Sequence, residues 1–243
     1  MRPPVFLAAA GQLGGDTVVL GGDEGRHAAT VRRLAPGERV DLTDGAGTMA
    51  ECVITAARPG ELELAVLARR AEPAPAPRLT VVQAIPKGDR GELAVETMTE
   101  VGADVIVPWA AQRCVVRWRE KADKGVARWR SAAVSAAKQS RRAWFPEVTP
   151  VAGLAEVTAR VRAASLALLL DPDAELALAA ARFPAAGEIV LLVGPEGGIA
   201  PEEASVLVGA GATGARLGPT VLRASSAGAV AAALVMSAAG RWS

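Results

Sequence analysis

One glycine-rich turn has the composition of a ligand-binding loop. Residues 191–198 have the sequence LLVGPEGG, so an apolar segment ends abruptly in a Gly-Pro-Glu-Gly-Gly turn. A helix start follows, with Pro201 in its first turn and Glu202 and Glu203 beside it. Glycines let backbone amides approach a ligand closely, and small molecules bind at the carboxyl edge of open α/β sheets. The pattern predicts a small-ligand site, and a plain strand-to-helix turn is the alternative.

A second candidate loop, residues 217–223 with the sequence LGPTVLR, follows a short expected strand. Its Gly-Pro pair limits flexibility, and Arg223 comes directly before the last expected helix. An arginine at this place would stabilise an anionic group or a developing negative charge in a pocket. Alternatively, it would cap a neighbouring helix, and the residues alone leave both interpretations open.

A strongly basic segment lies in the middle of a chain whose net charge is only +1. Residues 113–142 contain ten lysines and arginines but only two acidic residues. Trp118, Trp129 and Trp144 are interleaved with these cations, and aromatic rings beside guanidinium groups suit stacking on unpaired bases. We therefore expect RNA contacts here, with at least one tryptophan in the core. A solvated helix face with salt bridges is the alternative.

Other chemistries find no support. Residues 209–214 match G-x-G-x-x-G, but they follow a helix instead of a strand, so we interpret them as a helix end and turn. The chain has no P-loop motif. A single histidine, His27, excludes a His-based metal cluster and is expected to be structural. We expect no bound metal.

The remaining composition indicates a cytoplasmic protein. Cys52 and Cys114 lie far apart and suit ordinary reduced thiols. Residues 1–4 lead directly into a short apolar segment without the pattern of a signal peptide. No apolar run reaches membrane-spanning length, so no membrane association is expected.

The elements that would position these loops fall into two parts. Residues 1–72 are β-rich, with a hairpin at 38–56 around the turn DGAG and a short helix at 27–34. A stiff Pro/Ala linker follows at 73–78. From residue 79 to 243 strands and helices alternate, which predicts a mostly parallel sheet covered by helices. We expect strands at 79–85, 104–108, 113–118, 166–170, 189–193 and 216–217, and helices at 90–101, 120–140, 151–163, 201–208 and 225–239, the last capped by Ser225 or Ser226.

Several separated motifs, taken in order, resemble the RsmE family of SPOUT-class methyltransferases. Residues 27–37 are similar to the family's PUA-like N-terminal domain. The resemblance covers nearly the whole chain, and the ordered set is specific although each motif alone is weak. The other matching segments are QAIPKGDR (83–90), TEVG (99–102), IVP (106–108), RCVVR (113–117), KQSRR (138–142), PEV (146–148), GPEGG (194–198), LGP (217–219) and LR (222–223).

The resemblance implies an α/β fold: a SPOUT-type trefoil-knot domain preceded by a small PUA-like β-barrel domain. It also implies a homodimer that methylates N3 of a uridine in 16S rRNA, within the assembled small ribosomal subunit. Uracil N3 lies on the Watson–Crick edge, so the target must be unpaired. S-adenosylmethionine is the implied cofactor, held by Leu170, Asp171, Pro172, Gly194, Pro195, Gly197, Gly198, Leu217, Gly218, Leu222, Arg223 and Ser225.

Catalytic and RNA-binding roles are assigned with the same resemblance in mind. Arg223 or Lys87 is expected to stabilise negative charge on the uracil oxygens, and Glu196 is a candidate proton acceptor. The alternative for Glu196 is a cap for the helix that begins near Pro201. RNA phosphates are expected to meet cationic and polar residues from both parts of the chain: Arg2, Arg32, Arg33, Arg113, Arg117, Lys138, Gln139, Arg141 and Arg142.

The chain departs from the family pattern at one place that bears on catalysis. Many members carry Thr-Glu-Thr after the arginine, where this chain has Ala224, Ser225 and Ser226. A glutamate at that place therefore cannot be the general base. Two other functions stay open: a SPOUT methyltransferase acting on a ribose 2′-OH or another base, and a non-catalytic RNA-binding or ribosome-assembly protein.

Overall fold

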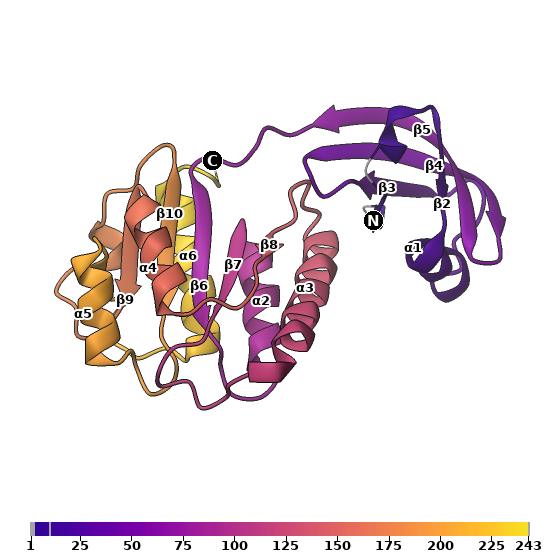
Figure 1. The fold of residues 1–243 in the computed structure, drawn as a ribbon. Helices are drawn as coiled ribbons and strands as arrows, with labels where there is room; N and C mark the ends of the chain where they lie inside the picture. The colour runs from indigo at the N-terminus through magenta and orange to yellow at the C-terminus, as the bar shows by residue number, and fades with distance from the viewer. Residues whose placement is uncertain (1–2, 10, 243) are drawn as a thin grey trace. The chain divides into compact units, whose positions relative to one another are not determined.

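A computed structural model describes residues 3–9 and 11–242 (Figure 1). The chain forms two compact units. The first contains the residues through Ala74 together with Ala137–Phe145, and the second contains Pro75–Ala136 and the residues from Pro146 onward. A short stretch of the basic segment thus belongs to the first unit, although most of that segment lies in the second.

The first unit is built on a five-stranded sheet with the order β1-β3-β4-β5-β2. The β1 strand is parallel to β3, and the other neighbours are antiparallel. The expected hairpin is confirmed, because β3 and β4 pair around the predicted turn. The expected short helix begins earlier, at Gly22, and continues as a π-helix. The bounds are β1 (Val5–Leu7), η1 (Gln12–Gly14), β2 (Thr17–Leu20), α1 (Gly22–Arg26), η2 (His27–Val31), β3 (Arg39–Thr43), β4 (Thr48–Arg58) and β5 (Glu61–Ala71).

Alternating apolar side chains give this sheet one buried face. Phe6, Leu42, Ile54 and Leu62 belong to its core and are at most 2% exposed. Period-two alternation places such residues on one side of each strand. Helix α1 approaches the sheet closely at Gly25, where an added Cβ would lie 2.3 Å from a backbone carbonyl oxygen.

The second unit contains six parallel strands in the order β11-β9-β10-β6-β7-β8. Its central strands are continuous apolar runs, as expected for a sheet that is covered on both faces. Leu191 and Leu192 point to opposite faces of β10 and are both fully buried. The bounds are β6 (Arg78–Ala84), β7 (Val105–Trp109), β8 (Glu147–Val148), β9 (Leu166–Leu170), β10 (Glu188–Val193) and β11 (Thr213–Ala215).

Helices cover both faces of this sheet (Figure 1). Side chains of α2, α3 and α6 share one buried cluster, and those of α4 and α5 share the other. The prediction of a parallel sheet between helices is therefore confirmed. The bounds are α2 (Arg90–Val101), η3 (Arg119–Lys121), α3 (Ala122–Gln139), α4 (Leu154–Ala163), η4 (Leu178–Ala180), α5 (Pro201–Gly209) and α6 (Ala224–Ala238).

Three local predictions are wrong. Residues 113–118 form no strand, and β7, the strand that precedes them, is flanked on both sides by β6 and β8. The short strand near Arg216 lies earlier, at Thr213–Ala215, and Arg216 makes only an isolated bridge with Ala177. Helix α6 begins one residue early, so Arg223 occupies the N-cap position and no side chain caps the helix.

No helix in the described part of the chain is long and apolar enough to cross a membrane. Among the same residues, no group of three or more His, Cys, Asp or Glu side chains could hold a metal ion.

Candidate active site

Three loops at the carboxyl edge of the second sheet enclose one cavity of about 660 Å³. They follow β9, β10 and β11, which are neighbours in the sheet. Because these strands are parallel, their carboxyl ends meet at one edge, where α/β proteins bind small ligands. The lining comes from 169–173, 193–196, 198–199, Ala204, Ala215, 217–218, 220–224 and Ala227.

The glycine-rich turn after β10 needs its small residues. A Cβ on Gly194 would lie only 2.7 Å from Cγ1 of Ile199, which also lines the cavity. Gly198 has a φ of +72°, in the left-handed region that favours glycine. Its N–H donates to the Pro195 carbonyl at 2.9 Å and closes the turn. The prediction of a tight turn carrying bare backbone into a pocket thus matches the local geometry.

The structure brings together most of the residues that the sequence assigned to the cofactor. Two assigned residues are absent from the cavity lining. Gly197 faces Arg113, whose Nη1 donates to the Gly197 carbonyl at 3.1 Å, and Ser225 lies buried in the first turn of α6. Ten assigned residues line the cavity: Leu170, Asp171, Pro172, Gly194, Pro195, Gly198, Leu217, Gly218, Leu222 and Arg223.

Sequence reasoning missed part of the cavity wall. Leu169, Val193, Ile199 and Val221 add apolar surface beside the assigned residues. The signal that could have found them is their position next to a motif residue in the sequence.

The chemistry of the lining fits S-adenosylmethionine. Leu170, Val193 and Ile199 supply apolar surface suited to a flat heteroaromatic ring. Asp171, Glu196 and Arg223 place charges of both signs around the same cavity. The methionine part of the cofactor carries an amine, a carboxylate and a sulfonium, so a mixed-charge rim suits it. The cavity is therefore a chemically suitable cofactor pocket.

The three candidate catalytic residues lie at or near this cavity. Arg223 and Glu196 line it with exposed side chains. Glu196 Oε1 accepts a hydrogen bond from the backbone N–H of Lys87 at 3.3 Å, so the segment after β6 is joined to the glycine loop. The alternative that Glu196 caps the helix near Pro201 is wrong, because α5 begins after Ala200 without a side-chain cap.

Two predicted RNA-binding residues near the end of α3 are engaged in ion pairs inside the first unit. Lys138 Nζ lies 2.6 Å from Glu24 Oε1, and Arg141 Nη1 lies 3.3 Å from Asp41 Oδ2. Arg141 also donates to the Pro3 carbonyl. Burial raises the pKa of Asp41, although Arg141 acts to lower it. This supports the salt-bridge alternative for these two residues.

The three tryptophans of the basic segment differ in their burial and contacts. Trp129 is 1% exposed, so base stacking is wrong for it and the expectation of one core tryptophan is confirmed. Trp144 donates its indole N–H to the Glu72 carbonyl at 3.0 Å. Trp118 is only half-buried.

The other predicted RNA contacts keep their status as predictions. Arg32 and Arg33 are exposed, and Arg33 adopts a φ of +54°. Gln139 is exposed and Arg142 is half-buried. Arg2 lies outside the described residues.

A family model described as an RNA methyltransferase domain matches residues 72–236. The chain belongs to this RNA methyltransferase family. A second model, an RNA methyltransferase PUA domain, matches residues 20–67. The Ribosomal RNA small subunit methyltransferase E of Mycobacterium bovis is 48% identical over 233 residues, which cover 94% of this chain and 89% of that protein.

Solved structures agree with this membership. The crystal structure of a Ribosomal RNA small subunit methyltransferase E from Neisseria gonorrhoeae, bound to S-adenosyl methionine, has a TM-score of 0.87 and 30% identity, covering 97% of this chain and 98% of that one. A Legionella pneumophila protein in complex with the same cofactor has a TM-score of 0.87 and 25% identity, covering 98% of each chain. The fold is thus the SPOUT-type α/β fold with an N-terminal PUA-like domain, and the cofactor is S-adenosylmethionine.

Proposed function

We propose that this protein transfers a methyl group from S-adenosylmethionine to N3 of an unpaired uridine in 16S rRNA. One observation carries the proposal. Three loops after neighbouring parallel strands enclose a single cavity that fits the cofactor, in a chain 48% identical to a ribosomal RNA small subunit methyltransferase. The assembled small subunit is the proposed substrate, and the cytoplasm the proposed compartment.

The protein's part in the reaction is positioning and electrostatics. When bound, the cofactor supplies a methyl group that its sulfonium already activates. The loops of the cavity hold cofactor and base in reacting geometry, a contribution on the order of 7–11 kcal/mol. Arg223 lies at the rim, where its guanidinium would stabilise negative charge on a uracil carbonyl as N3 loses its proton. Glu196 is the proposed acceptor of that proton.

The backbone contact between Lys87 and Glu196 supports a role for the segment after β6. The backbone N–H of Lys87 donates to the Glu196 carboxylate and so orients Glu196 in the cavity wall. The exposed Lys87 ammonium would add a second positive charge beside the reacting base. We assign proton removal to Glu196 and charge stabilisation to Lys87.

A homodimer is supported by an exposed apolar surface on two packed helices. Leu93 of α2 is 53% exposed and Val230 of α6 is 41% exposed, and these helices pack against each other. Exposed apolar side chains on adjacent elements favour a protein contact. We propose that a second copy of this chain covers them, and that the first unit docks RNA.

The experiment that tests the function is methyl transfer from labelled cofactor to small ribosomal subunits that lack the modification. Digestion and mass spectrometry of the nucleosides should give 3-methyluridine. Arg223→Ala should lower the turnover number about 100-fold, and Arg182→Ala, which removes an exposed arginine outside the cavity lining, should leave it unchanged. Methylation on ribose or on another base would refute the N3 assignment.

A further inference from the structure

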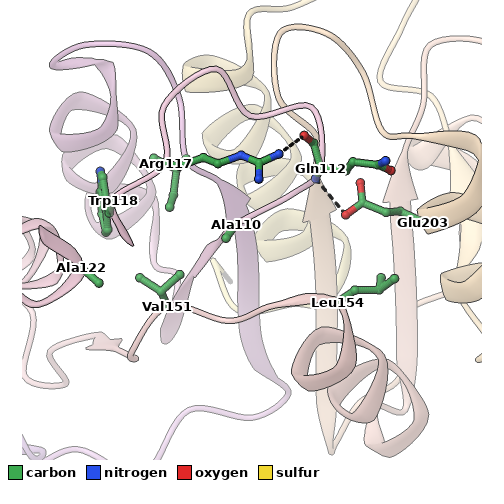
Figure 2. A pocket seen from close by; sticks show the side chains of 9 residues that line it. Ala110, Gln112, Arg117, Trp118, Ala122, Val151, Leu154 and Glu203 are labelled. Atoms are coloured by element: carbon green, nitrogen blue, oxygen red, sulfur yellow. Dashed lines mark hydrogen bonds between the residues drawn. The ribbon is translucent and has the colours of Figure 1, made fainter. Parts of the chain in front are cut away.

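A second cavity, of about 470 Å³, opens at the carboxyl edge of the same sheet (Figure 2). It shares no lining residue with the cofactor cavity. Segment 110–118, which follows β7, connects the two. Arg113 donates to the Gly197 carbonyl of the glycine loop, and Gln112 and Arg117 line the second cavity. A ligand in this cavity would therefore contact a segment that is hydrogen-bonded to the glycine loop of the cofactor cavity.

One wall of the cavity is a fixed aromatic surface. The Trp118 indole packs on Gly125 of α3, where an added Cβ would lie 2.4 Å from indole Cδ2. Buried Trp129 meets the same ring edge-to-face, with ring centroids 5.2 Å apart. These contacts hold the indole in place while it also lines the cavity. A rigid, half-buried aromatic ring is the kind of surface on which unpaired bases stack.

The polar end of the cavity has an unused acceptor. Glu203 is 6% exposed, and its Oε1 accepts the backbone N–H of Gln112 at 3.0 Å (Figure 2). Its Oε2 is buried and has no hydrogen-bond partner among the described residues. A buried carboxylate oxygen without a donor is unfavourable, so a ligand N–H that meets it after a small rotation of the Glu203 side chain would be stabilised here.

A cation completes the set. The exposed Arg117 guanidinium donates to the Gln112 carbonyl at 3.1 Å through Nη2, which steadies it beside the cavity. A guanidinium presents five N–H donors, so this one retains donors for a phosphate oxygen. Aromatic surface, acceptor and cation correspond to the base, the base edge and the phosphate of one nucleotide.

We propose that this cavity binds an unpaired nucleotide of the RNA that neighbours the target, with a base that carries an exocyclic amino group. The base stacks on Trp118, its amino group donates to Glu203 Oε2, and its phosphate meets Arg117. The proposal rests on the RNA methyltransferase function and adds a specificity-determining site to it. A carboxylate accepting from the cytosine amino group is an established form of base recognition.

The test compares three probes that differ at one group: cytidine, uridine and N4,N4-dimethylcytidine 5′-monophosphates. Each is titrated into the full-length protein saturated with S-adenosylhomocysteine, which blocks the cofactor cavity, and binding is followed by saturation-transfer NMR. Cytidine monophosphate should bind at least fivefold more tightly than the other two. Equal binding of cytidine and its dimethyl analogue would overturn the proposal.

Glu203→Gln sharpens this test, because glutamine can keep its Oε1 on the Gln112 N–H and turn an NH2 toward the unused position. The preference should then shift from cytidine to uridine, whose O4 is an acceptor. Glu202→Gln, on the exposed neighbouring carboxylate, should leave the preference unchanged. An unchanged preference in Glu203→Gln would refute the role of this carboxylate.

Trp118 is tested by substitutions that preserve or remove the ring. Trp118→Phe should retain cytidine binding within about threefold, whereas Trp118→Leu should abolish it, with thermal unfolding measured for both. If the Trp118→Leu protein is folded and binds cytidine monophosphate as tightly as the Trp118→Phe protein, the stacking role of Trp118 is refuted.

Methylation kinetics distinguish failure of this inference from failure of the proposed function. With small ribosomal subunits as substrate, Glu203→Gln should raise KM for the RNA about tenfold and leave kcat unchanged. Unchanged KM in an active enzyme would overturn only the second site. Absence of methyl transfer by the unmodified protein would refute the function itself.

Discussion

Gly194→Ala should weaken cofactor binding by adding one methyl group behind the cavity wall. The new Cβ would lie 2.7 Å from Ile199 Cγ1 and 3.3 Å from Cδ1, so the isoleucine has to move. The backbone nitrogen of the same residue is only 3.4 Å away, which limits how far the turn can yield. Because Ile199 lines the cavity, its displaced side chain competes with the cofactor for space.

The expected size follows from the cost of overpacking. One additional methyl group in a packed position costs about 1–3 kcal/mol. Each 1.4 kcal/mol changes a binding constant tenfold, so S-adenosylmethionine should bind about 5- to 150-fold more weakly. Isothermal titration calorimetry measures this directly, and Gly194→Ala with Ile199→Ala should recover affinity because the clashing side chain is gone.

Gly197→Ala is the matched control. Its Cβ would meet Arg113 Cβ at 3.6 Å, an ordinary contact, and Gly197 does not line the cavity. Cofactor affinity should stay within about twofold of the unmodified protein. Equal affinity losses at positions 194 and 197, or none at 194, would refute the assignment of Ile199 to the cavity wall.

Three further predictions concern stability, and the last of them also separates a structural cation from an RNA-binding one. Arg241→Ala removes the ion pair to the buried Asp104 carboxylate and should lower the free energy of unfolding by about 3–5 kcal/mol in a denaturant titration. Burial raises the pKa of the Cys52 thiol from 9.0 to about 11, so the protonated thiol contributes its full stability below pH 9 and loses it as the pH rises from 9 to 11. Cys52→Ser should therefore make the free energy of unfolding less dependent on pH between 9 and 11. The same pH dependence in both proteins would contradict this. Lys138→Ala should cost about 1 kcal/mol of unfolding free energy, whereas exposed Arg32→Ala should cost nothing but reduce the log–log salt slope of single-stranded RNA binding by about 0.7.

Much of the second unit could be predicted from the chain itself. The apolar runs at 166–170 and 189–193 are continuous because both of their faces are buried, and this marks strands of a covered parallel sheet. Helix α2 begins and ends where predicted, since Gly102 terminates it in the left-handed conformation. The turn at 194–198 was identifiable because its glycines meet a local steric requirement.

The misplaced details depend on distant parts of the chain. Residues 113–118 contain two valines and a tryptophan, which favour a strand, yet β7, the strand before them, already has neighbours on both sides. A lysine in a basic segment such as Lys138 is expected at the surface. Its ion pair could not be predicted, because its partner Glu24 lies far away in the sequence. Likewise, nothing local to Glu203 indicates that its carboxylate holds the backbone of Gln112.

The position of the cavity-lining loops in the sequence determines when the cofactor cavity can form during synthesis. Its wall begins at Leu169 and is complete only with Ala227, whereas the strands β6 and β7 that support the sheet precede it by many residues. A nascent chain leaving the ribosome can form the first unit's sheet early, because domains fold as units during synthesis. Cofactor binding, and the stabilisation by ligand that accompanies it, becomes available only after the loop at 217–223 and the start of α6 have emerged.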